Sequence, residues 1–136
     1  MDRLSEARRW FSEAEWDLGT AKDLCSLRRY NASAFYAQQA AEKAVKALLY
    51  ALGQMPIGHS VRQLLERFAG LTGHDVSSLL SAARELDRHY VPSRYPNALP
   101  SGTPHEAYDE EAARRAISCA KTIIDFVRRY LSGLGL

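Results

Sequence analysis

The stretch that decides the fold is "FYAQQAAEKAVKALLYALG", which runs from Phe35 to Gly53. Its apolar residues recur at steps of three and four, so they form one stripe along a helix. A polar stripe runs beside them. The apolar stripe predicts a core helix, and the polar stripe is either a solvated face or a seam that meets a partner or a nucleotide. The apolar stripe consists of Ala34, Ala37, Ala41, Ala44, Val45, Leu48 and Leu52; the polar stripe holds Gln39, Glu42, Lys43, Lys46 and Tyr50.

Four more segments carry helical patterns. The first covers about residues 2–28, and the short "RRYN" link after it predicts an antiparallel hairpin with the second helix, for which Asn31 is the expected cap. Ser60 opens a short third helix that ends near Gly70, and Asp75 caps a fourth that runs to about Tyr90. The last helix begins at Asp109, with Thr103, Pro104 and Glu106 offering an earlier start.

The segment between the fourth and last helices contains a proline at every fourth position, from Pro92 to Pro104. Neither a helix nor a central strand persists through such spacing. We therefore expect a loop of about 16 residues, a length that is often functional. Because no segment alternates as a strand does, the sequence predicts one all-α domain over residues 1–136, an up-and-down bundle of four or five helices.

Composition narrows the function only slightly. The net charge of +2 on 136 residues is too small to indicate nucleic-acid binding by itself. No apolar run approaches the roughly 20 residues that span a bilayer, and the N-terminus lacks a signal-peptide core, so we expect a cytoplasmic protein. Cys25 and Cys119 lack the spacing of a redox or zinc pair, and the four histidines lack metal-ligand spacing. No metal or other cofactor is expected.

Several motifs together resemble the HEPN family, the higher eukaryote and prokaryote nucleotide-binding domains, and within it the subgroup that carries an RYP motif. They are "AQQAAEKAVKALL" in the second helix, His59 before the third, "ELDRHYVPSRYPN" at the end of the fourth, and "YDEEAARRA" leading into the last. The resemblance implies a HEPN-like bundle, a homodimer, and frequent pairing with a separate minimal nucleotidyltransferase in a toxin–antitoxin module. It favours a nucleotide- or RNA-binding module, with a metal-independent endoribonuclease toxin as the alternative.

Arg84 and His89 have the R-x4-H spacing of the family's ribonuclease motif. Histidine can move the protons of RNA cleavage and arginine can hold the strained phosphate. However, a five-residue step leaves the two side chains roughly 140° apart unless the helix unwinds near His89. Tyr90 also follows His89 directly, whereas one residue intervenes in the toxin subgroup. A composite catalytic site at a dimer interface and a structural role at the helix end both remain open.

Arg94 and Tyr95 lie between two prolines, where an extended backbone leaves Arg94 free to grip a phosphate and Tyr95 free to stack on a base. The alternative is that Tyr95 packs onto the bundle while Arg94 caps a helix end or pairs with Glu42. We expect Arg94 to meet Glu42 in one polar cleft. Lys43, Lys46 and His59 are expected to line the same cleft.

Trp10 and Trp16 flank the apolar stripe of the first helix, so at least one should lie off the core line. An exposed tryptophan would suit a dimer seam or packing against a chain end.

Overall fold

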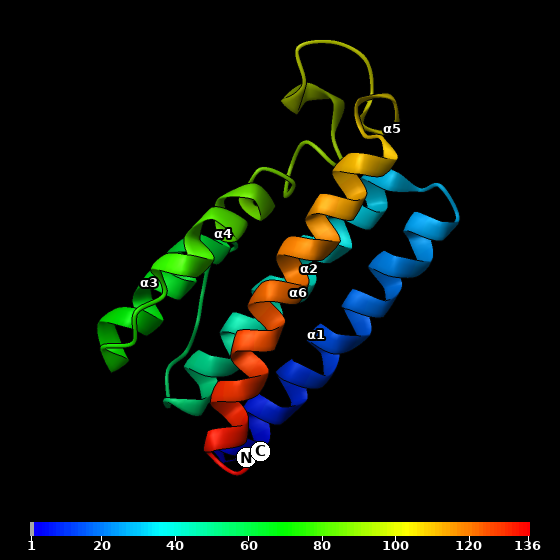
Figure 1. Ribbon diagram of the computed structural model, residues 1–136. Helices are drawn as coiled ribbons and strands as arrows, with labels where there is room; N and C mark the ends of the chain where they lie inside the picture. The colour runs from blue at the N-terminus through cyan, green and yellow to red at the C-terminus, as the bar shows by residue number, and fades with distance from the viewer. Residues whose placement is uncertain (1) are drawn as a thin grey trace.

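The computed structural model describes residues 2–136, and within this range the chain is helical with no strand. Figure 1 shows the predicted all-α bundle, which is confirmed. None of the helices between residues 2 and 136 is long and apolar enough to cross a membrane. The elements are α1 (Arg3–Ser26), α2 (Tyr30–Ala51), α3 (Val61–Thr72), the 3-10 turn η1 (Ser77–Leu79), α4 (Leu80–Asp87), the 3-10 turn η2 (Pro96–Ala98), α5 (Pro104–Ala107) and α6 (Glu110–Gly133).

The central element is α2, which contacts each of the other α-helices. It forms the predicted antiparallel hairpin with α1, whose buried Ala7, Ala14 and Ala21 recur every seven residues. Such small side chains let the two helix axes approach closely. The hydroxyl of Ser33 donates a 2.7 Å hydrogen bond to the carbonyl of Ala21 and ties the hairpin together.

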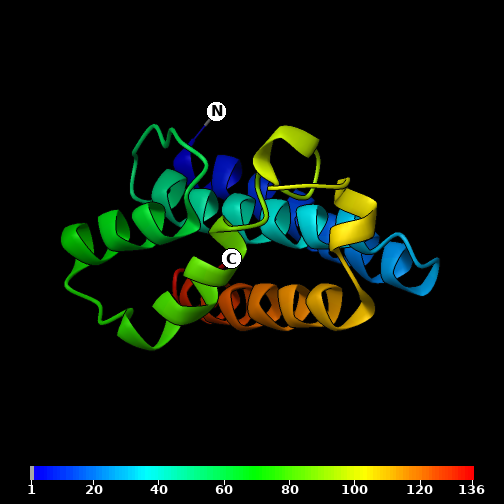
Figure 2. The same cartoon turned by 90° about the horizontal axis from the view of Figure 1, so that it is seen from above.

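The helix α6 lies against α2 and α1 and closes the core with a buried apolar stripe that includes Ile123, Ile124 and Val127. Figure 2 shows α6 on one side of α2, whereas the segments that follow α2 and α4 lie on the other side. One side of α2 is therefore covered by α6, and the other side is covered by the segments that follow α2 and α4.

A shared cap joins α3 to α4. Ser60 caps α3 as predicted, since its hydroxyl accepts from the Gln63 amide at 3.1 Å. The carboxylate of Asp87, the last residue of α4, accepts from the Ser60 hydroxyl at 2.6 Å and from the Val61 amide at 2.7 Å. The end of α4 is thus fixed against the start of α3.

Several helix boundaries differ from the predicted ones. Asp75 does not cap the fourth helix: its carboxylate accepts from the Ser77 amide at 2.9 Å at the start of η1, and α4 begins only at Leu80. The fourth helix ends at Asp87 rather than near Tyr90, because the chain turns there and the side chains of Ser93 and Arg94 donate to the carbonyls of His89 and Tyr90. Asn31 is not a cap: it lies inside the first turn of α2 and donates to the carbonyl of Ser93 at 3.1 Å.

The proline-rich segment is more ordered than a plain loop, since it contains η2 and α5. Both starts considered for the last helix are used. Thr103 and Glu106 form a capping box that begins α5, and the carboxylate of Asp109 accepts from the Ala112 amide to begin α6. The two short elements carry the chain from the end of α4 back to α6.

Candidate functional site

Arg94 lies in a cage of aromatic rings at the end of the turn that follows α4. The central carbon of its guanidinium is 4.5 Å from the ring centroids of Phe35 and Tyr90 and 4.9 Å from that of Tyr95. Its Nε–H donates to the carbonyl of Tyr90 at 2.7 Å. Stacked rings fix a planar cation without using its remaining N–H donors. The guanidinium is therefore held in place, with donors available for an anion.

The polar residues of α2 form a network around Glu42, which is only 4% exposed. Its carboxylate accepts from Gln38 at 3.1 Å and from Lys46 at 3.0 Å, and Nδ1 of His59 lies 3.3 Å from it. Gln39 donates to Gln38 at 2.8 Å. A buried carboxylate with this many partners is satisfied inside the fold.

His59 connects this network to the aromatic cage. Its imidazole stacks on the ring of Tyr90, with centroids 4.5 Å apart and planes inclined by 17°. Tyr90 is also one of the rings around Arg94. The network around Glu42 therefore reaches the guanidinium through two contacts, His59 on Tyr90 and Tyr90 on Arg94. The sequence-predicted residues Arg94, Tyr95, His59, Glu42 and Lys46 thus form one continuous assembly.

The predicted ion pair between Arg94 and Glu42 is wrong. Across residues 2–136 the charged partners of Glu42 are Lys46 and His59, and Arg94 instead contacts the rings of its cage. Arg94 does lie against α2, but at Phe35, which is two helical turns, or about 10 Å, before Glu42. Its bond to the Tyr90 carbonyl closes the turn after α4, so Arg94 does not cap the end of a helix either.

Lys43 lies outside the assembly. Its ammonium is 2.5 Å from the carboxylate of Asp17 on α1, and Asp17 is only 3% exposed. On α2, Lys43 follows Glu42 by one residue, and a step of about 100° turns its side chain toward α1. The expectation that Lys43 lines the same cleft as Arg94 is therefore wrong.

His89 is buried beside this assembly and uses both ring nitrogens. Nε2 is 2.7 Å from the carboxylate of Glu85, and Nδ1 is 2.8 Å from the hydroxyl of Tyr108. Burial lowers the pKa of His89, although Glu85 acts in the opposite direction. Burial, aided by the charge of Glu85, raises the pKa of Tyr108 to about 12. A neutral imidazole fits these contacts, with Nε2–H donating to Glu85 and the Tyr108 hydroxyl donating to Nδ1.

Arg84 does not join His89. Its side chain is exposed on α4, and within the described chain no hydrogen bond or ion pair links the two residues. The helix does end before His89, but the imidazole turns inward to Glu85 and Tyr108. One chain alone thus holds the two residues of the R-x4-H spacing in different environments.

Sequence reasoning missed three residues that shape these sites, namely Phe35, Glu85 and Tyr108 as a partner of His89. Glu85 and His89 are four apart on a helical segment, a spacing that predicts contact. Phe35 and Tyr108 carry no such signal, because their contacts depend on how the chain returns after α4. Among residues 2–136 no cluster of three or more His, Cys, Asp or Glu side chains is arranged to hold a metal ion.

Comparisons with known proteins place these features in a family context. A family model described as the HEPN domain matches residues 7–130. A candidate toxin of Methanocaldococcus jannaschii, MJ1304, is 27% identical over 136 residues, covering 94% of this chain and 90% of that protein.

Three crystal structures are similar to the whole bundle. TT1696 from Thermus thermophilus has a TM-score of 0.87 and 37% identity, covering 95% of this chain and 98% of its own. ST0689, an archaeal HEPN homologue, has a TM-score of 0.76 and 37% identity, with 96% and 99% covered. The HEPN domain protein TM0613 from Thermotoga maritima has a TM-score of 0.73 and 35% identity, with 91% and 98% covered.

Proposed function

This chain belongs to the HEPN domain family, and from that premise we propose that it is a toxin-type member that binds the phosphate of a nucleotide or RNA at Arg94. The likeness to the candidate toxin of M. jannaschii supports the toxin-type role. In this proposal the protein works together with a separate minimal nucleotidyltransferase.

The observation that carries the binding proposal is the aromatic cage of Arg94. Of the five N–H donors of the guanidinium, the described structure occupies one, the Nε–H that donates to Tyr90. A bidentate contact with a phosphate uses two of the others. Tyr95, which is half exposed, lies 4.9 Å from the guanidinium and offers a ring on which a base can stack.

The network on α2 acts in this proposal as support for the cage. Glu42 and Lys46 orient His59, and His59 stacks on Tyr90. These are positioning residues, since the carboxylate and the ammonium are nearly buried and paired with each other. Removing one partner would leave a buried charge and loosen the ring contacts.

The partner proposal draws on exposed apolar side chains in the loop before His59 and on Tyr95. Met55 and Ile57, in the loop that leads to His59, are 77% and 81% exposed, and Tyr95 is 50% exposed. Exposed apolar side chains close to a polar site are typical of protein interfaces. We call Met55, Ile57 and Tyr95 the rim, and we assign the rim to the nucleotidyltransferase partner. We assign the homodimer contact to a different surface, the outer face of α1.

Binding at Arg94 is tested by titrating the purified protein with ATP and with a labelled single-stranded RNA at low salt. We expect Arg94→Ala to weaken binding at least tenfold. Arg94→Lys should weaken it nearly as much, because an ammonium keeps the charge but cannot stack or bind bidentately. Arg129→Ala removes an exposed charge on α6 and serves as the control. Unchanged affinity in both Arg94 variants would contradict the proposal.

The partner is tested by co-purification with a small nucleotidyltransferase encoded beside this chain. We expect Met55→Ser/Ile57→Ser to lose the complex and Leu71→Ser, which changes an exposed leucine on α3, to keep it. Retention of the complex by the Met55/Ile57 variant would remove the rim from the interface.

One observation favours the endoribonuclease alternative. The exposed Arg84 has no hydrogen-bond or ion-pair partner within residues 2–136, so it is open to a substrate phosphate. The burial of His89 argues against it, because a general base must reach the 2′-hydroxyl. RNA cleavage in EDTA by the wild type and by His89→Ala decides the matter. Equal cleavage excludes His89 from catalysis, and cleavage by neither protein favours the binding module.

A further inference from the structure

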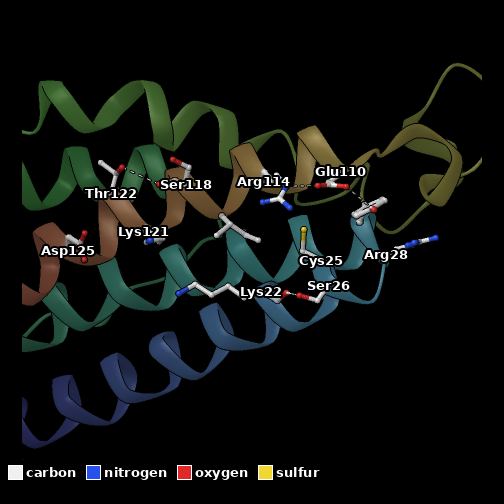
Figure 3. A pocket seen from close by; sticks show the side chains of 12 residues that line it. Lys22, Cys25, Ser26, Arg28, Glu110, Arg114, Ser118, Lys121, Thr122 and Asp125 are labelled. Carbon is white, nitrogen blue, oxygen red and sulfur yellow. Dashed lines mark hydrogen bonds and ion pairs between the residues drawn. The ribbon is translucent and has the colours of Figure 1, made fainter.

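A groove of about 660 Å³ lies between α1 and α6. Figure 3 shows side chains from both helices and from the turn after α1 around this groove. Figure 2 shows α6 on the side of α2 away from the segments after α2 and α4. None of the residues that line the groove belongs to the Arg94 cage. The residues that line the groove include Lys22, Cys25, Arg28, Tyr30, Arg114 and Lys121.

The groove has an excess of positive charge. Its two acids are already neutralised, since Glu110 pairs with Arg114 at 2.6 Å and Asp125 pairs with Arg128 at 2.7 Å. Lys22, Arg28 and Lys121 have no ion pair in the part of the chain that the structure describes. Three exposed cations therefore line the same groove, Arg28 at its end, without a carboxylate paired to any of them.

Arg28 provides a second, independent observation. Its φ is 64°, and within residues 2–136 it is the only residue other than glycine with a positive φ. It closes α1 in the manner of a C-terminal glycine: its amide donates to the Cys25 carbonyl at 3.0 Å, and the Arg29 amide donates to the Leu24 carbonyl at 2.9 Å. Glycine adopts this conformation without strain, whereas a residue with a Cβ does not. The fold thus accepts strain at a residue that lines one end of the groove, where the side chain of Arg28 extends outward (Figure 3).

The shape and the floor of the groove indicate the class of ligand. The groove follows α6 from Glu110 to Asp125, a rise of about 22 Å, which exceeds the length of one phosphate group. Cys25 and Ile117 give it an apolar floor, and the half-buried ring of Tyr30 lies at the Arg28 end. Cations along the walls can bind successive phosphates, and an aromatic ring at one end can stack on a base. This combination fits a single-stranded nucleic acid.

We propose that the α1–α6 groove binds the phosphodiester backbone of single-stranded RNA. Lys22 and Lys121 contact phosphates from opposite walls, Arg28 contacts a phosphate at the end, and Tyr30 stacks on a base. This site does not depend on the Arg94 cage. A protein with both sites holds RNA at two different sets of residues.

The experiment measures the affinity of a labelled 2′-O-methyl oligouridine, which cannot be cleaved through its 2′-oxygen, over a range of KCl concentrations. We expect Lys22→Ala/Lys121→Ala to weaken binding more than tenfold in 50 mM KCl. Loss of two phosphate contacts should also reduce the slope of log K against log salt by about 1.4. Arg3→Ala/Arg129→Ala removes the same charge outside the groove and should change both quantities little. Equal weakening in the two double variants would overturn the proposal, since only net charge would then matter.

The variant Arg28→Gly distinguishes a loss of RNA binding from a loss of stability. It removes the guanidinium and relieves the positive φ, so the variant should unfold at a higher urea concentration than the wild type while binding RNA more weakly. Unchanged RNA affinity in Arg28→Gly would remove Arg28 from the site.

Two further experiments identify the class of ligand and distinguish this site from the Arg94 cage. Polyglutamate of matched charge should compete poorly with the oligouridine, and equally good competition would overturn RNA as the ligand class. Loss of binding in Arg94→Ala but not in the groove variants rejects this inference and leaves the proposed function standing. The reverse result supports the groove and rejects the Arg94 cage.

Discussion

At the scale of single residues, His89 links pH to stability. Burial lowers its pKa in the folded protein below the ordinary 6.5. Glu85 acts in the opposite direction, and the charges of Arg115 and Arg88 lower the pKa further. As the pH falls through 6.5, the unfolded chain takes up the proton first. The stability that the neutral His89 provides is therefore complete above pH 6.5 and is lost below it.

We expect the free energy of unfolding to decrease between pH 7.5 and 5.5, with His89 contributing at most about 1.4 kcal/mol per pH unit. His89→Gln should show a shallower decrease, and His105→Gln, which changes an exposed histidine, should keep the wild-type slope. Urea unfolding at several pH values measures this. Identical slopes in all three proteins would show that His89 does not titrate between the folded and unfolded states.

The sequence predicted which residues gather at the Arg94 site better than it predicted how they pair. Periodicity places Glu42 and Lys46 one turn apart, and they do pair. It does not show which neighbouring helix each polar side chain faces, so Lys43 was expected beside Arg94 but binds Asp17. The cage itself depends on Phe35 meeting a segment almost 60 positions later, and no local pattern carries that contact.

At the scale of elements, Asp87 connects two helices. Its carboxylate accepts from the hydroxyl of Ser60 and the amide of Val61 at the positive end of α3. We expect Asp87→Ala to lower the free energy of unfolding by about 1–3 kcal/mol, since it removes a cap and leaves donors without a partner. Asp87→Asn keeps an acceptor and should cost less.

Urea denaturation measures the effect, with Glu13→Ala as a control because Glu13 is exposed on α1. A cost for Asp87→Ala no greater than that of the control would show that α3 does not need this cap. The same contact explains why sequence patterns extended the fourth helix too far. Apolar spacing continues to Tyr90, but the Asp87 cap and the turn closed by Ser93 and Arg94 end the helix earlier.

At the scale of the whole molecule, the core depends on α2. Leu48, in the last turn of α2, is completely buried. We expect Leu48→Ala to lower the free energy of unfolding by about 2–5 kcal/mol through lost contacts and the cavity left behind. Leu71→Ala, in which the leucine is 50% exposed, should cost much less. Similar losses from both substitutions, measured by urea denaturation, would contradict the role of α2 as the centre of the core.

The outer face of α1 is the surface that we assign to the homodimer. Trp16 and Leu27 are 72% and 69% exposed and lie three turns apart on the same face, with Thr20 and Asp23 between them. Trp16 is thus the tryptophan off the core line, whereas Trp10 packs on Tyr50. Gly19 is exposed in the middle of the helix, with open space beside it. Glycine weakens an exposed helix, but it lets a second helix approach closely.

An antiparallel pairing of two α1 helices about a two-fold axis places Trp16 against the partner's Leu27 and Thr20 against the partner's Asp23. Each copy then contributes the same apolar and hydrogen-bonding contacts, as an isologous interface requires. We expect sedimentation equilibrium at micromolar concentration to give twice the chain mass of 15.2 kDa. Trp16→Ser should raise the dimer dissociation constant more than tenfold, and Met55→Ser should leave it unchanged. A monomeric wild type would exclude the dimer, and dissociation by Met55→Ser alone would move the interface to the loop before His59, where it would compete with the nucleotidyltransferase for the same rim.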